Sequence, residues 1–223
     1  MRSPFHVEKP REALDRVFSS LRTPPDWNEG ERPRKTPFRR LAQMSEGVSP
    51  GYTAILYGKD SLPLFAHVAA FLVMPARMSV GVVCVERTPD AVMTEIISCV
   101  SGIPPYYLRE RRVPPPLFAT LNIALSRIYH AHLYFSKPEA DMRSIYSLAA
   151  WLKRRHGVKV LMIDSIEGLT NAPADRTTLL RTNQELQGIA HNLGLCLVAA
   201  SHSIGIYKSL RRGAVVDADG YEW

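Results

Sequence analysis

Three apolar runs of this sequence end in side chains that could carry out chemistry together. One run ends at Asp164, a second at Glu86, and a third at the pair Ser201 and His202. Continuous apolar runs of this length are typical of strands buried in a parallel sheet, and such strands deliver their carboxyl ends to one edge. We therefore expect two carboxylates, a hydroxyl and an imidazole to meet at that edge, where α/β proteins bind ligands.

These residue types are the ones that hydrolysis of a nucleoside triphosphate requires. A glutamate can activate water, an aspartate can hold Mg²⁺ through its water shell, and a polar group on a third strand can sense the γ-phosphate. On this interpretation the candidate catalytic residues are Glu86, Asp164 and His202, and Asp164 is also the candidate metal ligand. Taken alone, the run before Asp164 is also compatible with an aspartate that only begins a turn.

Helical patterns separate these strands along the chain. Strands are expected over residues 52–57, 79–86, 132–135, 158–164 and 195–200, and helices over residues 64–74, 88–102, 117–128, 141–156 and 177–193. Residues 103–116 are basic and rich in proline and include the aromatic pair Tyr106 and Tyr107. This mixture is typical of a solvated connector, and contact with nucleic acid is the alternative. The alternation of strands and helices predicts an α/β fold with a doubly wound, mostly parallel sheet.

The composition is that of an ordinary soluble globular protein. Of the 223 residues 46% are hydrophobic and 22% are charged, enough for one sizeable core. The three cysteines, Cys84, Cys99 and Cys196, lie in apolar contexts and are expected to be reduced core residues of a cytoplasmic protein. The longest apolar stretch falls short of the ~18 residues of a membrane helix, so no membrane partner is expected.

The charge of the chain favours a polyanionic partner. The formal net charge is +7 and the isoelectric point is near 9.5, which favours nucleic acid over a membrane surface. Before position 41 the chain has ten Lys and Arg residues against six Asp and Glu residues. A solvated basic tail would account for that part of the excess equally well.

The first 36 residues are expected to form a segment apart from a globular domain over residues 37–223. They combine an amphipathic helix over residues 8–22 with a proline-rich basic linker. The apolar stripe of this helix consists of Leu14, Val17, Phe18 and Leu21. A helix of this length needs a surface to pack on, which could belong to a neighbouring subunit, giving self-association, or to its own core.

Four segments resemble the C-terminal motor domain of the DnaB-type replicative helicases, a RecA-like family. Residues 83–89 are similar to a strand ending in S-L-E-M-S, which places Glu86 on the water-activating glutamate. Residues 152–164 resemble L-K-x-x-H-G followed by the Walker B aspartate, here Asp164. Residues 198–202 stand where the family has A-L-S-Q, so His202 replaces the γ-phosphate-sensing glutamine. Residues 209–219 are close to S-D-L-R-E-S-G-x-I-E-Q-D-A-D.

The resemblance runs from about residue 38 to the last residue. It implies a RecA-like, P-loop NTPase-type fold, ATP and Mg²⁺ as cofactors, DNA as a partner with single strands favoured, and association with a hexameric replicative helicase. After the sensor strand the family has a long DNA-facing loop, which is shortened here but keeps Lys208, Arg211 and Arg212 as candidate nucleic-acid contacts. The family continues beyond Trp223 into strands that carry an arginine finger, so either this relative is truncated or another chain completes the sheet.

The phosphate-binding loop departs from the family pattern. The G-K-T position falls on Asp60, Ser61 and Leu62, and the Gly-Lys pair at Lys59 directly follows a strand. Lys59, Asp60 and Ser61 are therefore the candidate nucleotide contacts of a degenerate Walker A loop. A carboxylate pointed at a triphosphate would repel it, and a leucine cannot bind Mg²⁺. A divergent loop that still works is the alternative.

Two hypotheses follow for the function. In the first, the chain is a non-catalytic or weakly active relative that binds DNA, a hexameric helicase or both, in DNA replication or repair. In the second, it is an active ATP-dependent helicase with a divergent phosphate loop. The loss of the loop lysine and hydroxyl favours the first, because these groups stabilise the transition state of phosphoryl transfer.

Overall fold

The computed structural model describes residues 7–21, 50–58, 61–74, 76–137, 141–169, 175–202 and 214–217. Over these residues the chain forms a seven-stranded sheet of order β1-β4-β3-β5-β6-β2-β7. The strands are β1 (Val7–Glu8), β2 (Thr53–Tyr57), β3 (Val80–Cys84), β4 (Leu133–Ser136), β5 (Val160–Asp164), β6 (Cys196–Ser201) and β7 (Ala214–Asp217). Neighbouring strands are parallel throughout, except that β1 pairs antiparallel with β4.

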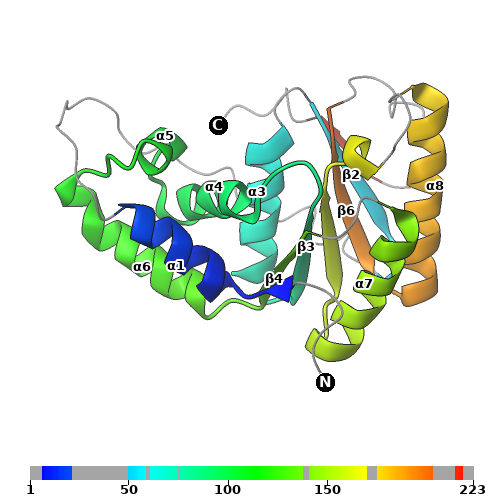
Figure 1. Cartoon of the computed structure of the whole chain (residues 1–223), viewed down its shortest axis with the longest axis horizontal. Coiled ribbons are helices and arrows are strands. Elements are labelled where there is room, and N and C mark those ends of the chain that lie inside the picture. The colour runs from blue at the N-terminus through cyan, green and yellow to red at the C-terminus, as the bar shows by residue number, and fades with distance from the viewer. Residues whose placement is uncertain are drawn as a thin grey trace.

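Helices cover both faces of the sheet (Figure 1). One face carries α3 (Ser61–Val73), α4 (Pro89–Ser101), α5 (Pro105–Arg109) and α6 (Phe118–Tyr129), and the other carries α7 (Met142–His156) and α8 (Arg176–Leu193). Successive residues of β3 alternate between the two apolar layers, because Val82 packs with α3 and α4 and Val83 packs with α7. The predicted doubly wound, mostly parallel α/β sheet is confirmed.

Side-chain caps explain why three helices begin at the carboxyl edge of the sheet. Thr88 Oγ1 accepts the Ala91 N–H at the start of α4, and Asp141 and Asp175 cap α7 and α8 in the same way. Each of these helices ends at a glycine in the left-handed region, where a residue without a Cβ is favoured. The sequence therefore sets both ends of all three helices.

Two details differ from the expectations. The segment expected to be a solvated connector, residues 103–116, contains α5 and the start of the 3₁₀ helix η1 (Pro115–Leu117). Prolines begin both helices, because proline presets φ for a first helical turn and needs no N–H partner at that position. In addition, α3 begins at Ser61 itself, three residues earlier than the helical pattern predicts.

The N-terminal segment packs on its own chain. Helix α1 (Pro10–Leu21) lies beside α4 and α6 (Figure 1), and it buries Ala13 and Leu14 in their apolar cluster. Of the two surfaces that could receive this helix, its own core is the one that the structure shows. The side chains of Val17, Phe18 and Leu21 lie outside the described part of the chain.

Two further findings concern the described residues. The three cysteines are free thiols, and all of them are buried. No helix of the described chain is both long and apolar enough to span a lipid bilayer.

Candidate functional site

The carboxyl ends of β3 and β5 are joined by main-chain hydrogen bonds. The carbonyl oxygen of Asp164 accepts the N–H of Val85 at 2.7 Å and the N–H of Glu86 at 3.1 Å. The sheet register pairs Cys84 with Asp164, so the residues that follow β3 turn across the end of β5. The two predicted acids are therefore neighbours at one edge of the sheet.

The carboxylate of Asp164 forms an ion pair with an arginine. The guanidinium of Arg87 forms an ion pair with Asp164 Oδ1, and the backbone N–H of Arg87 donates to Oδ2 at 3.3 Å. The Asp164 side chain is 1% exposed and the Arg87 side chain 22% exposed. Burial raises the pKa of the Asp164 carboxyl above its ordinary value, and the positive charge of Arg87 opposes that shift.

Glu86 and His202 meet as the sequence predicts. His202 Nε2 lies 2.8 Å from Glu86 Oε2, and about a third of each side chain is exposed, 32% and 33% respectively. A Cβ at Gly168, in the 3₁₀ helix η2 (Glu167–Leu169) after β5, would lie 2.8 Å from Glu86 Cγ. A glycine is therefore needed there for the close approach of η2 to the strand end.

A second glutamate organises the end of β6. Glu167 Oε1 accepts the hydroxyl of Ser201 at 2.5 Å and the backbone N–H of His202 at 3.0 Å. These two contacts place the His202 side chain over the turn that carries Glu86. Glu167 is not among the residues expected from the sequence, because it belongs to none of the motifs found there.

Arg87 was missed as well, although the sequence carries a signal for it. It stands directly after Glu86, at the methionine position of the S-L-E-M-S strand of the resembling family. The substitution of an apolar residue by a cation beside two expected acids could have indicated an ion pair. The sequence does not reveal which of the two acids the cation contacts.

The phosphate-loop candidates are only partly described. Ser61 is the first residue of α3, and its buried Oγ has no hydrogen-bond partner in the described structure. Gly58, at the end of β2, donates its N–H to the carbonyl of Ser201, so this strand ends at the same edge as Asp164. Lys59 and Asp60 lie outside the described residues, as do the nucleic-acid candidates Lys208, Arg211 and Arg212.

The described residues of this edge do not fit Mg²⁺ in their present arrangement. Magnesium binds through one or two carboxylates and keeps several waters. Both oxygens of Asp164 face Arg87, and Glu86 faces His202. Within the described ranges no group of three or more His, Cys, Asp or Glu side chains could hold a metal ion. The guanidinium and the backbone N–H of Arg87 therefore occupy the two oxygens of the carboxylate that a metal ion would need.

Comparisons with known proteins agree with this architecture. The family model described as the DnaB-like helicase C-terminal domain matches residues 34–203. A solved structure of a DnaB-like replicative helicase and its interactions with primase is similar, with a TM-score of 0.62 and 16% identity over 90% of this chain. A second solved structure, described as an ATPase domain, is similar to the same degree, also with a TM-score of 0.62 and 16% identity over 90% of this chain.

The extent of these matches differs between the two structures. This chain spans 51% of the length of the replicative helicase chain and 73% of the ATPase-domain chain. At 16% identity the two likenesses establish the fold alone. A search of curated protein sequences found no match.

Proposed function

Because this chain belongs to the DnaB-like helicase C-terminal domain family, we propose that it works in DNA replication or repair without robust ATPase activity. In this role it binds DNA, a hexameric replicative helicase, or both. The RecA-like fold supplies the binding surfaces, and the carboxyl edge of the sheet no longer turns over nucleotide.

The observation that carries this proposal is the ion pair between Arg87 and Asp164. In a working site this carboxylate must be free to contact the water shell of Mg²⁺. The metal ion neutralises charge on the transferring phosphoryl group. Here the guanidinium of Arg87 already neutralises the charge of Asp164. A metal ion would have to compete with this guanidinium for one buried carboxylate, which disfavours metal binding.

A titration with labelled ATP and Mg²⁺ tests the proposal directly. The wild type is expected to show no saturable binding up to millimolar nucleotide. The matched variant is Arg87→Met, because methionine is the residue of the family pattern at this position and removes only the cation. Saturable binding of Mg·ATP by the wild type at micromolar concentration would contradict the proposal.

The DNA-binding part of the proposal rests on charge. The net charge is +7, and Lys208, Arg211 and Arg212 follow the sensor strand in sequence. Binding of labelled single-stranded DNA is expected to be salt-sensitive and sequence-tolerant. Changing both Arg211 and Arg212 to Ala should reduce the salt slope by about 1.4, because each phosphate contact on a single strand contributes about 0.7.

The control for this experiment removes the same charge elsewhere. Arg154 and Arg155, exposed at the C-terminal end of α7, lie at the opposite edge of the sheet from Asp164. Their double change to Ala should leave the salt slope unchanged. Equal reductions of the salt slope in the two double variants would disprove a specific DNA site. Co-elution with a hexameric helicase without DNA affinity would indicate a protein partner alone.

A second candidate function has its own supporting observation. Glu86 and His202 are 2.8 Å apart beside Asp164, the arrangement that a water-activating acid and a γ-phosphate sensor need. Under this alternative the chain is an active ATPase or helicase with a divergent phosphate loop. Phosphate release that is stimulated by DNA and abolished by Glu86→Gln would establish it.

A further inference from the structure

Helix α5 carries an exposed aromatic ring and an exposed arginine on one face. Tyr106 is 50% exposed, and exposed Arg109 follows it three positions later within the same helix. Side chains three positions apart in a helix are neighbours on its surface. The ring of Tyr106 also contacts the ring of buried Tyr107 edge to face, with the two centroids 5.6 Å apart. This contact fixes the exposed ring against the core.

The turn after α5 adds two more arginines to this end of the helix. The N–H of Arg111 donates to the Leu108 carbonyl at 3.3 Å, and the N–H of Arg112 donates to the Tyr107 carbonyl at 2.8 Å. These two hydrogen bonds form a Schellman motif, which folds the chain back against the end of a helix. Both arginines are exposed. Three arginines are therefore gathered with Tyr106 at one short helix.

Arg111 has a backbone conformation that favours glycine. Its φ is 57°, in the left-handed region. The same region is occupied by the glycines that end α4, α7 and α8, which are Gly102, Gly157 and Gly194. A side chain with a Cβ is strained there, so an arginine is less stable than a glycine at this turn. Strain of this kind is found at functional sites, and here it points to a use for the guanidinium.

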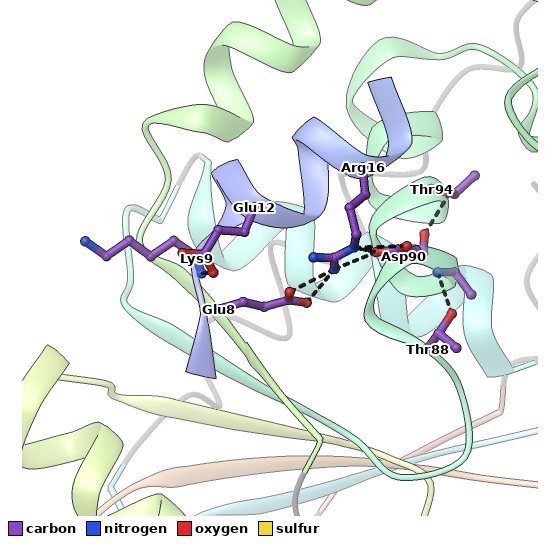
Figure 2. A network of polar contacts seen from close by, with 8 residues as sticks. Glu8, Lys9, Glu12, Arg16, Thr88, Asp90 and Thr94 are labelled. Carbon is purple, nitrogen blue, oxygen red and sulfur yellow. Dashed lines mark hydrogen bonds and ion pairs between the residues drawn. The ribbon is translucent and has the colours of Figure 1, made fainter. Parts of the chain in front are cut away.

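The three arginines of this helix end are not paired with an acid in the described part of the chain. None of their guanidinium groups takes part in an ion pair or a hydrogen bond there, although exposed Glu110 stands among them in sequence. Arg16 shows the contrast, because its Nη2 lies 2.8 Å from Glu8 Oε2 and 2.7 Å from Asp90 Oδ1 (Figure 2). The charge at the end of α5 is therefore available to an anion outside the chain.

Buried residues on both sides hold this helix end in place. Ile103 before α5 and Val113 after its turn are buried, as is Leu108 within the helix. The Ser98 hydroxyl of α4 donates to the Ile103 carbonyl at 2.6 Å. Helix α5 packs on α4, on the side that faces away from the sheet (Figure 1). The exposed side chains are thus presented on a fixed support, which lowers the entropy cost of binding.

We propose that this end of α5 is a binding surface for single-stranded DNA. This α5 surface consists of Tyr106, Arg109, Arg111 and Arg112. Its arginines bind backbone phosphates, and the ring of Tyr106 stacks on a base. A single strand fits better than a duplex, because the bases of a duplex already stack on one another. The inference rests on the proposed function and adds a second surface to the one expected at Arg211 and Arg212.

The salt dependence of DNA binding tests the role of the arginines. The parent for this test is the full chain with Arg211→Ala and Arg212→Ala, so that the remaining binding reports other surfaces. It should still bind a labelled single-stranded DNA of mixed sequence, measured by fluorescence anisotropy. Adding Arg111→Gly and Arg112→Ala should reduce the salt slope by about 1.4, because each phosphate contact on a single strand contributes about 0.7.

The matched control removes the same charge from α7. Arg154→Ala with Arg155→Ala in the same parent should leave the salt slope unchanged, because both arginines lie on another helix. An unchanged slope in the variant of Arg111 and Arg112, or an equal fall in the control, would overturn the proposal.

Glycine at position 111 separates lost binding from lost folding. Arg111→Gly alone should raise the midpoint of thermal unfolding by about 1–3 °C, because glycine adopts a positive φ without strain. Weaker DNA binding together with a raised midpoint cannot result from unfolding. A lowered midpoint would contradict the strain at Arg111 and with it the proposal.

The aromatic ring is tested separately from the charge. In the same parent, Tyr106→Ala should weaken binding of single-stranded DNA about five- to tenfold and change duplex binding by less than about twofold, because only an unpaired base can stack on the ring. Tyr106→Phe keeps the ring and should stay within about twofold of the parent. Equal weakening by Ala and Phe, or equal weakening for single strands and duplexes, would overturn the proposal.

The outcomes keep this inference apart from the proposed function. If the parent binds no DNA while the wild type does, the α5 surface fails and the proposed function stands. If the wild type binds no DNA, the DNA-binding part of the proposed function fails as well. Tighter binding of an RNA strand of the same sequence would overturn the assignment of the α5 surface to DNA.

Discussion

Two buried carboxylates of this protein, Glu8 and Asp164, each face an arginine, but the two ion pairs are built differently. Glu8 and Arg16 are eight residues apart in one N-terminal segment, and Arg16 also serves Asp90. Asp164 and Arg87 are 77 residues apart, at the ends of neighbouring strands. Arg16 is half-exposed, whereas Arg87 is mostly buried.

This difference separates two tasks that a buried ion pair can perform. The ion pair of Glu8 with Arg16 holds the N-terminal segment against the surface of the domain. Its loss should detach that segment without disrupting the sheet. The ion pair of Asp164 with Arg87 joins two strand ends in the middle of the sheet and engages the acid that the sequence indicates as the candidate metal ligand. We therefore expect the second pair to matter more for global stability.

The largest expected effect on stability comes from breaking the ion pair between Arg87 and Asp164. Arg87→Ala should lower the free energy of unfolding by about 3–5 kcal/mol, because it leaves Asp164 buried without a counter-charge. Denaturant unfolding followed by circular dichroism measures it. Arg112→Ala removes an exposed arginine and should change stability by less than about 0.5 kcal/mol. Similar losses of stability in the two variants would show that the ion pair between Arg87 and Asp164 has no special importance for the fold.

Loss of the ion pair between Arg16 and Glu8 should give the next largest effect on stability. Arg16→Ala should cost about 2 kcal/mol, because Glu8 loses its partner but can gain water when the segment detaches. Limited proteolysis should then cleave within residues 7–21 at low protease concentration while the described residues from 76 to 137 stay resistant. A fragment pattern identical to that of the wild type would contradict the role assigned to Arg16.

A pH series can sharpen the comparison at Asp164. Burial raises the pKa of this group above its ordinary value near 3.8, so the folded state binds its proton more tightly than the unfolded state. The contribution of Asp164 to stability is therefore greatest in acid and decreases as the pH rises through the folded pKa. The stability of the wild type relative to Asp164→Asn should fall over that window, by at most about 1.4 kcal/mol per pH unit. A relative stability that rises with pH would mean that Arg87 outweighs burial.

The smallest effect is expected where a buried polar group has no partner to lose. Ser61→Ala should not lower the free energy of unfolding and should raise it by up to about 1 kcal/mol, because the change removes a buried hydroxyl that forms no hydrogen bond in the described structure. Ser98→Ala removes a hydroxyl that donates to the Ile103 carbonyl at 2.6 Å and should cost about 1 kcal/mol. Thermal unfolding of both variants measures the difference. A larger cost at Ser61 would reveal a partner for this hydroxyl.

Much of the fold could be predicted from local patterns. The runs before Glu86, Asp164 and Ser201 are buried strands, and parallel pairing brings their carboxyl ends together. Caps and glycines fix the helix ends because they act within a few residues of the chain. The meeting of Glu86 with His202 follows from the same reasoning, since it needs only the strand order and the edge.

The side-chain partners could not be predicted in this way. Periodicity indicates which face of an element is buried, but it does not indicate which acid an arginine will contact across 77 residues. The ion pair of Arg87 with Asp164 depends on the exact turn after β3, and the ion pair of Arg16 with Asp90 joins residues 74 positions apart. β1 is only two residues long and has no sequence pattern of its own.

That short strand has a practical consequence for any shortened form of the protein. By pairing with β4, β1 supplies hydrogen-bond partners to main-chain groups along the outer side of the sheet. A fragment that begins at residue 50 would leave those N–H and C=O groups open as a template for strands of other molecules. Such a fragment should aggregate more readily than the full chain, so expression designs for this domain should retain the chain from residue 7 onward.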